Sequence, residues 1–476
     1  MKLFQRFDEF LVGKIAFPLV NSLLNRRQIF RHHRELLELE SLPPERIQEI
    51  QLQRFKHLLR YAYNWCPYYK KKLSAAGIAP DAIHSLEDVG RIPPLERREI
   101  VEHHVDMVDV RHRSSISVAD KSGRPPGVPV FGLFRRHKLI RNTSTGSTGI
   151  PTIFYEDGST SALNWARELQ LKSWFGLGVG VKEARFARVS TEFLPKSKML
   201  RARKRLWNQL ILPGMNLSDS DYDFCLHEIL RFRPRILWGI TTALTGFAEH
   251  IRRSQMSRDS WHPDLVITWA APMYEHEEQL LSEVFECPVT NVYGTREVGH
   301  VAARCPAFSL HVNQGDFLVE IEQSGPAEKS GEILVTALHP SPMPFIRYRV
   351  GDLGELSSSH CSCGRRLQVL RHVLGRTNEV LHTSDGRMLA PNFWCRVFML
   401  DLTSRAVERF QVVYRKDQSI RIRIVPKQNY SPNTESFLKD LLEKNLGAST
   451  RFEFEYVPEI PPHPTGKYHL VVNERF

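Results

Sequence analysis

Short runs typical of β-strands alternate with helical patterns between residues 141 and 347 of this chain. The strand-like runs are rich in branched and aromatic residues, and apolar residues between them recur at three- and four-residue spacing. Such alternation is typical of an α/β domain, in which helices connect the strands and cover the sheet. We therefore expect layered sheets and helices, with strands near residues 151–155, 235–239, 265–271, 288–292 and 332–336.

The two flanks of this region follow other patterns. Up to about Ser85 the apolar residues have helical spacing, with a break at Pro43-Pro44. Beyond about residue 376, alternating strand-like runs surround a helical stretch near residues 437–446, which predicts a small α+β unit. We accordingly expect a helical region at 1–85 within a large domain, the rest of that domain at 86–376, and a small C-terminal domain at 377–476.

Charge and cysteine content limit the classes of partner and compartment. The net charge of +12 favours anionic partners, but no helix-turn-helix, zinc-finger or RNA-binding signature indicates nucleic acid. Seven cysteines in 476 residues do not form a disulfide framework, so we expect a reducing, cytoplasmic location. We expect neither a secretory signal nor a membrane-spanning helix, because charged residues interrupt the apolar runs. The sequence leaves the oligomeric state open, and a homodimer is one of the alternatives.

The apolar segment from Phe10 to Leu24 has two interpretations. It carries little charge and is followed by Arg26, Arg27 and Arg31. Apolar area next to basic charge favours a membrane interface, which would make the protein peripheral at the inner face of the membrane. The alternative interpretation is that this segment forms a helix that packs on its own domain.

A loop of glycines and hydroxyl residues is the first candidate binding element. It consists of Ser144, Thr145, Gly146, Ser147, Thr148 and Gly149, followed by Ile150 and Pro151. Glycines allow close backbone approach, and hydroxyls with backbone N–H groups suit phosphate oxygens. No lysine follows at the Walker A spacing, so a decisive cation would come from elsewhere. A solvated linker of the same composition is the alternative.

Four further motifs follow in order along the chain. In the segment from Asn291 to Glu297, Tyr293 can stack on a base, Thr295 can contact a phosphate and Glu297 can bind a hard cation. Asp352, which we expect just after a strand, has a carboxylate that can accept hydrogen bonds from two ribose hydroxyls. The third motif is Leu374 to Glu379, and the fourth contains Gly466-Lys467. Singly, each is weak.

Together, the five motifs in this order resemble the adenylate-forming superfamily of acyl-CoA synthetases, and within it the phenylacetate–CoA ligase branch. Within that branch, the chain is similar to members associated with capsule and exopolysaccharide synthesis. The Cys66-Pro67-Tyr68-Tyr69 element and the Pro93-Pro94-Leu95 turn are features of the branch. The Gly-Glu element that the superfamily has near Ala270-Ala271-Pro272 is missing.

The resemblance implies a role for each motif. Residues 144–149 would close over the ATP phosphates, Tyr293 and Gly294 would lie at the adenine, and Thr295 would contact the α-phosphate. Glu297 would hold Mg²⁺, Asp352 would bind the ribose with help from Arg376, and Lys467 would be the catalytic lysine on a mobile C-terminal lid. The catalytic set is then Lys467, Glu297 and Thr295.

This resemblance implies an AMP-forming ligase that activates a small carboxylic acid with ATP and Mg²⁺. The acyl group would pass from acyl-adenylate to an acceptor thiol, such as coenzyme A, or to an amine, with a role in polysaccharide biosynthesis as one setting. A carboxylate and ATP repel each other, by about 4 kcal/mol per charge pair at ~4 Å and an effective dielectric of roughly 20. One lysine touching both would offset that repulsion. The alternative is a catalytically degenerate nucleotide-binding scaffold in glycan assembly at the membrane surface.

Cysteine and histidine positions form a separate candidate metal site. Cys361-Ser362-Cys363-Gly364 can chelate Zn²⁺, and Cys305 with His311 lies upstream of a strand-rich stretch that would bring the pairs together. Four such ligands suit a closed structural zinc site. Similar positions recur in the resembled branch, and free thiols are the alternative.

Overall fold

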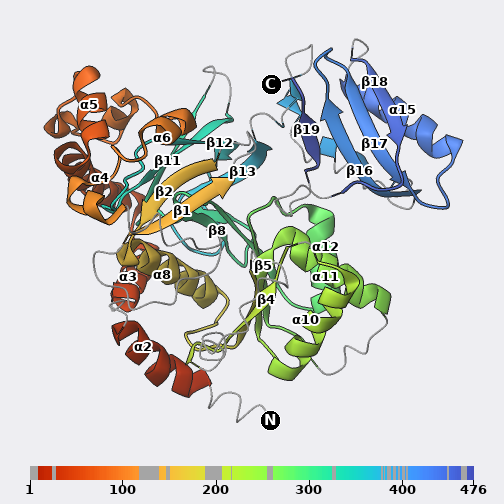
Figure 1. Ribbon diagram of the computed structural model, residues 1–476, viewed down its shortest axis with the longest axis horizontal. Helices are drawn as coiled ribbons and strands as arrows, with labels where there is room; N and C mark the ends of the chain where they lie inside the picture. Colours follow the sequence, from red (N-terminus) through yellow and green to blue (C-terminus); the bar gives the residue numbers. More distant parts are fainter. Residues whose placement is uncertain are drawn as a thin grey trace. The chain divides into compact units, whose positions relative to one another are not determined.

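The computed structural model describes residues 9–23, 28–116, 139–145, 151–187, 206–215, 217–254, 261–323, 329–376, 379, 381–382, 388–389, 393–394, 397–398, 403, 406–446, 450–461 and 469–475. The chain divides into two compact units (Figure 1). The large unit comprises Met1–Ala271, Leu280–Val350 and Glu355–Arg371, and the small unit comprises Pro272–Gln279, Gly351–Gly354 and His372–Phe476. The domain division at residues 85/86 and 376/377 stays a prediction.

The N-terminal part of the large unit is helical, as expected. Pro44 occupies the first turn of α4, where its missing N–H costs nothing, and Cys66 with an extended backbone separates α4 from α5. A capping box between Glu96 and Glu99 begins α6. The elements are η1 (Val12–Ala16), α2 (Phe17–Leu23), α3 (Gln28–Leu39), α4 (Pro44–Trp65), α5 (Pro67–Ala75), η2 (Pro80–Ala82), η3 (Glu87–Arg91), α6 (Arg97–His103) and η4 (Val110–Ser115).

An antiparallel hairpin carries the glycine- and hydroxyl-rich stretch. Strands β1 (Ile140–Thr145) and β2 (Pro151–Glu156) pair so that Ser144 lies opposite Thr152. Ser144 and Thr145 therefore belong to a strand, whereas we had expected the loop to begin at Ser144. The two strands stay paired as far as Thr145 and Pro151, which are partners, and the pairing therefore includes the residues at both ends of the loop.

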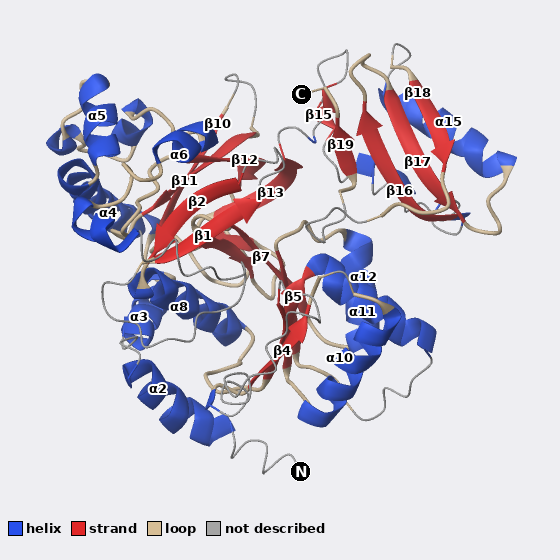
Figure 2. Cartoon of the chain, viewed as in Figure 1, coloured by secondary structure: helices blue, strands red, loops and turns tan. Residues whose placement is uncertain are grey.

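The main sheet has a parallel half and an antiparallel half (Figure 2). Strands β4, β3, β5, β6 and β7 are parallel neighbours, and helices make the crossovers that parallel strands need. From β7 through β8 and β9 to β13 the pairing is antiparallel. The order is β10-β11-β12-β13-β9-β8-β7-β6-β5-β3-β4.

Among the strands of this sheet, β5, β6, β7 and β11 agree with the expected runs within a few residues. They are β3 (Glu183–Ala187), β4 (Gln209–Pro213), β5 (Ile236–Ile240), β6 (Leu265–Trp269), β7 (Val289–Thr295), β8 (Gly299–Arg304), β9 (Leu310–Val312), β10 (Phe317–Glu322), β11 (Gly331–Ala337), β12 (Tyr348–Leu356) and β13 (Val369–Arg376). The helices are α8 (Gly158–Trp174), α10 (Asp219–Phe232), α11 (Thr241–Ser254) and α12 (Glu275–Phe285).

The core of the large unit lies between the parallel strands and the helices. Side chains of β5 and β6 such as Ile236, Leu265 and Ile267 are completely buried and cluster with Leu171 and Trp174 of α8. Each such aliphatic side chain stabilises the fold by about 1.5–3 kcal/mol relative to an exposed one. This packing fixes the carboxyl end of β7, where the candidate site begins.

The small unit is an α+β fold with its own core. Its sheet has the order β18-β17-β16-β19, and Leu438 and Leu442 of α15 pack on it around the buried Trp394. The elements are β14 (Leu381–His382), β15 (Met388–Leu389), β16 (Val407–Tyr414), β17 (Ile420–Pro426), α15 (Pro432–Leu446), β18 (Phe452–Tyr456) and β19 (Val471–Asn473). The expected fold class, an α/β domain with a smaller α+β one, is confirmed. No described helix has the length and apolar character that crossing a bilayer requires.

Candidate active site and metal centre

The carboxylate of Glu297 is the centre of a polar group in the large unit. Glu297 follows β7 and is 7% exposed. Ser144 Oγ, at the end of β1, donates a hydrogen bond of 2.5 Å to Glu297 Oε1. Arg97, the first residue of α6, donates to Ser144 Oγ at 3.3 Å and lies 3.7 Å from Glu297 Oε1. Two motifs that are 153 positions apart in the sequence are thus in direct contact.

The adenine and α-phosphate candidates are the last residues of β7. We had expected them to follow a strand, but β7 continues through Thr295 because it pairs with β8. The pairing has a bulge between Tyr293 and Gly294, and a Cβ at Gly294 would meet Gly299 O at 2.1 Å. Only glycine fits this close approach. Thr295 Oγ1 accepts a hydrogen bond from the Val298 N–H at 3.4 Å, which orients its hydroxyl.

Several predicted site residues lie outside the described part of the chain. Gly146, Ser147, Thr148, Gly149 and Lys467 are among them. Thr145 is described as the end of β1, without its side chain. The roles expected of these residues stay predictions.

The ribose candidates lie together in the small unit. Asp352 is inside β12 and not just after a strand, because β12, which lies between β11 and β13, continues to Leu356. The preceding residue, Gly351, has φ 78°, a backbone conformation that favours glycine. Arg376, at the end of β13, places its Nε 3.2 Å from Asp352 Oδ1, and Asp352 is only 7% exposed. The pair provides the acceptor oxygens that a diol needs, held in place by a cation.

A further acidic side chain, Glu156, is the last residue of β2 and lies at the open end of the hairpin, opposite Ile140. Asn142 Nδ2 donates to Glu156 Oε2 across the two strands at 2.9 Å. Burial raises the pKa of Glu156 to about 7, and nearby Arg296 offsets this only in part. The hairpin therefore contains a carboxyl group that titrates near neutral pH.

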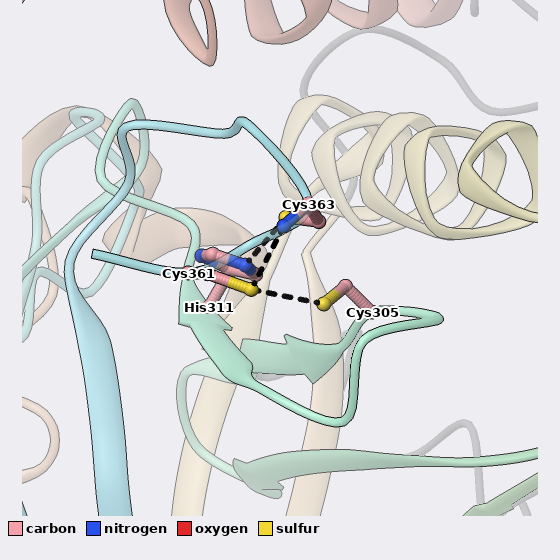
Figure 3. A group of neighbouring side chains, drawn as sticks. All are labelled: Cys305, His311, Cys361 and Cys363. Atoms are coloured by element: carbon pink, nitrogen blue, oxygen red, sulfur yellow. Dashed lines mark hydrogen bonds between the residues drawn. The ribbon is translucent and has the colours of Figure 1, made fainter. Parts of the chain in front are cut away.

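The four predicted metal ligands converge in one cluster (Figure 3). The ligand atoms of Cys305, His311, Cys361 and Cys363 all lie within 4.8 Å of one another. Cys305 Sγ and Cys361 Sγ are 3.7 Å apart, and Cys363 Sγ is 3.2 Å from His311 Nε2. A tetrahedral Zn²⁺ with Zn–S bonds of about 2.3 Å separates its sulfurs by about 3.8 Å, so the donors fit.

Groups around the cluster orient its donors. His311 Nδ1 is 3.3 Å from the carbonyl oxygen of Leu367, an arrangement that leaves Nε2 for a metal. The Cys363 N–H donates to Cys361 Sγ at 3.4 Å. Burial by itself would raise the pKa of the Cys361 thiol. Hydrogen bonds from Ser309 and from the Cys363 N–H outweigh this effect and lower the pKa. A more acidic thiol is a better zinc ligand.

A second group of metal-type ligands, His32, Asp316 and His339, is better explained as a buried ion cluster. Asp316 Oδ1 lies 2.8 Å from His32 Nε2 and 2.7 Å from His339 Nε2, and Oδ2 accepts from Arg167 at 2.5 Å. Burial would raise the pKa of Asp316, yet Arg167 and both histidines hold it well below its ordinary value. A guanidinium this close repels a cation, so the cluster joins α3 to the sheet region without a metal.

Sequence reasoning missed Arg97 as a member of the Glu297 group. The residue stands in an ordinary helix start, and no spacing relates it to residues 144 or 297. Only the contacts Arg97–Ser144 and Arg97–Glu297 reveal it. The nearest signal in the sequence is the Pro93-Pro94-Leu95 turn that places α6.

Comparison with known proteins supplies relatives for both units. The CapK C-terminal domain family matches residues 381–474. A phenylacetate–coenzyme A ligase of Thermus thermophilus is 26% identical over 357 residues, 72% of this chain and 73% of that protein. The CapK protein of Staphylococcus aureus is 21% identical over 431 residues, 89% of either chain.

Solved structures provide the same relationship at the level of the fold. A 2-hydroxyisobutyryl-CoA ligase in the postadenylation state, in complex with 2-HIB-AMP, superposes with a TM-score of 0.71 at 16% identity, covering 92% of this chain and 91% of that one. The protein is therefore a homologue of the phenylacetate–coenzyme A ligases and of CapK, with the fold of acyl-CoA ligases of the adenylate-forming superfamily.

Proposed function

We propose that this protein is an ATP-dependent, AMP-forming ligase that activates a small carboxylic acid. The observation that carries the proposal is the contact between Ser144, from the stretch predicted to bind phosphates, and Glu297, predicted to hold Mg²⁺. A linker of the same composition has no reason to lie against a buried carboxylate. The homologous phenylacetate–CoA ligases and the ligase-like fold support the same reaction class.

The proposed reaction has two steps. The substrate carboxylate attacks the α-phosphorus of ATP, a P–O bond to the β-phosphate breaks, and pyrophosphate leaves an acyl-adenylate. An acceptor then attacks the acyl carbonyl carbon, loses its proton, and AMP departs with the former carboxylate oxygen. The obstacle in the first step is the mutual repulsion of two anions, so cations decide the rate.

We assign roles to this chain's residues accordingly. Tyr293 stacks on the base, Thr295 orients the α-phosphate, and Asp352 with Arg376 holds the ribose. Glu297 would bind Mg²⁺, which neutralises phosphate charge and promotes departure of pyrophosphate. Arg97 holds the Ser144 hydroxyl beside the Glu297 carboxylate. Lys467 provides the positive charge that allows the carboxylate to approach the α-phosphate.

Pyrophosphate release with a panel of carboxylic acids tests this proposal. Lys467→Ala should lower the rate about 10²–10³-fold, as expected for removing a key electrostatic contact in a transition state. Lys416→Ala changes an exposed lysine of the small unit and is the matched control. Equal rates in both variants would reject the role of Lys467. ATP binding without pyrophosphate release from the wild type would instead favour the nucleotide-binding scaffold.

The acceptor of the acyl group is either coenzyme A or an amine. Homology to phenylacetate–CoA ligases supports coenzyme A, whereas similarity to CapK is the link to polysaccharide synthesis. Mass spectrometry of products with CoA and with amino sugars offered together distinguishes them. A cytoplasmic location and contact with a membrane surface are further proposals.

We also propose that Cys305, His311, Cys361 and Cys363 bind a structural Zn²⁺. The donor set and its spacing support four N/S ligands around one ion. Elemental analysis of the purified chain should find about one zinc per chain. The double variant Cys361→Ser/Cys363→Ser should lose it, and Cys287→Ser, another free cysteine, should keep it. Less than about half an equivalent in the wild type would contradict a four-ligand site.

A further inference from the structure

The N-terminal helix of the large unit presents an apolar face to the outside. Phe10, Ile15 and Leu19 are 57%, 55% and 58% exposed, and Leu11 between them is 38% exposed. They follow one another over the continuous helical segment at residues 9–23, which includes η1 and α2. Large apolar side chains exposed singly are ordinary, but several on one helix face mark an interaction site.

The opposite face of this helix is held firmly by the large unit. A Cβ at Gly13 would meet Val179 O at 2.3 Å, and one at Gly180 would meet Gly13 N at 2.5 Å, so the helix backbone lies directly on the 179–180 turn. Phe17 is buried and packs edge-on against Phe30 with ring centroids 5.7 Å apart. The exposed face is therefore presented by a docked helix.

The charged residues near this apolar face indicate which kind of partner can bind it. The segment from Phe10 to Leu23 contains no acidic residue, and its one charge, Lys14, is exposed between Leu11 and Ile15. The first 34 residues hold seven lysines and arginines against Asp8 and Glu9. Glu9 is buried, with Oε2 2.8 Å from Arg235 Nη1, so it adds little negative charge to the surface.

We propose that the Phe10–Leu19 face binds an anionic lipid bilayer, with the helix lying in the plane of the interface. Apolar side chains would enter the acyl boundary, and the Lys14 stem would follow them while its ammonium group stays at the head groups. The other occupant to consider is a second copy of the chain. Two like-charged segments repel at such a contact, whereas anionic head groups attract both of them.

This inference does not depend on the ligase reaction. It predicts where the reaction occurs: the acid or the acceptor would be handled beside a membrane surface. None of the residues in the proposed face belongs to the candidate active site, so activity towards soluble substrates should be unchanged when the face is altered.

Vesicle flotation with the full-length chain tests the proposal. Vesicles of phosphatidylcholine alone are compared with vesicles that contain about one third phosphatidylglycerol, at low and high salt. We expect binding to the anionic vesicles that weakens with salt. Phe10→Ser/Ile15→Ser/Leu19→Ser should lower the partition coefficient at least about tenfold, because three apolar anchors are lost. Lys14→Gln should lower it about fivefold, the effect of one charge near the surface.

A matched variant and an oligomer measurement make the result decisive. Val105→Ser/Val110→Ser/Phe224→Ser removes three exposed apolar side chains elsewhere, 41–44% exposed in the wild type, and should bind vesicles as the wild type does. Equal loss in both triple variants, unchanged binding in the Phe10 triple variant, or no wild-type preference for anionic vesicles would overturn the proposal. A wild-type dimer that the Phe10 triple variant converts to monomer would assign the face to a second copy. If the triple variant does not fold, the Lys14→Gln result decides.

Discussion

At the scale of single residues, the site depends on how buried charges are partnered. Glu297 is almost completely enclosed, yet its carboxylate touches the Ser144 hydroxyl and lies near the Arg97 guanidinium. The serine hydrogen bond and the long ion pair with Arg97, at 3.7 Å, hold this buried acid in place. It is therefore suited to take up a hard cation.

Glu297→Gln tests this at one atom. The substitution keeps the shape and a hydrogen-bond acceptor for Ser144 but removes the negative charge that a divalent cation needs. We expect carboxylate-dependent pyrophosphate release to fall about a hundredfold or more and the requirement for Mg²⁺ to rise. Glu45→Gln, at an exposed position of α4, is the control. An unchanged Mg²⁺ dependence would show that Glu297 does not hold the ion.

Glu156 provides a test by pH. Burial raises its pKa from 4.5 to about 7, so the folded chain keeps a proton that the unfolded chain has released. The stability that comes from the neutral form is complete below about pH 4.5 and is lost as the pH rises through 7.

Urea unfolding at pH 5 and pH 8 measures this difference. Glu156→Gln is neutral at both values, so it should lose less stability than the wild type between them, by on the order of 1 kcal/mol. Glu45→Gln again serves as the control. Parallel losses in the wild type and Glu156→Gln would mean that Glu156 is not a buried, protonated group.

Residue types and order alone provided candidates for the site but not their contacts. Tyr293, Thr295, Glu297 and Asp352 are candidates because their chemistry suits parts of a nucleotide, and their roles stay predictions. Arg97 was not found, because its role arises only when α6 and the end of β1 come together in the folded chain. Partners supplied by tertiary contact leave no local pattern.

At the scale of elements, the end of β7 and the hairpin beside it set the site. Short strand-like apolar runs predicted β5, β6 and β7, which are largely buried, and helical spacing predicted α4 and α15, which bury apolar side chains at that spacing. The same signals could not show that β7 extends through Thr295 or that Asp352 lies within β12, since backbone pairing with β8 and β13 decides both. Ala270, in the segment where the resemblance leads us to expect a Gly-Glu element, adopts φ 67°; the sequence shows that the element is missing but not this backbone conformation.

Gly294→Ala tests the bulge in β7. A Cβ there would meet the Gly299 carbonyl oxygen at 2.1 Å, so the β7–β8 pairing must shift. We expect a loss of about 1–3 kcal/mol in the free energy of unfolding and a marked fall in pyrophosphate release. Gly178→Ala, with open space around the position, should change neither. If Gly294→Ala behaves like Gly178→Ala, the strand end does not position the nucleotide.

At the scale of the whole molecule, we propose that the two units serve different parts of one reaction. In this proposal the large unit would contribute Ser144, Thr295 and Glu297, and the small unit would contribute Asp352, Arg376 and Lys467. Division of labour in this way would let one part of the chain serve the first step and then make room for the acceptor. The change of sequence pattern near residue 376 indicated a second domain, but it carries no information about which step each domain serves.

The path of one oxygen atom tests the central claim most directly. The substrate acid is labelled with ¹⁸O in its carboxylate, turnover is started with ATP and the acceptor, and the released nucleotide is weighed by mass spectrometry. Attack of the carboxylate on the α-phosphorus predicts AMP that carries one ¹⁸O. Label in inorganic phosphate together with ADP, or unlabelled AMP, would contradict the account.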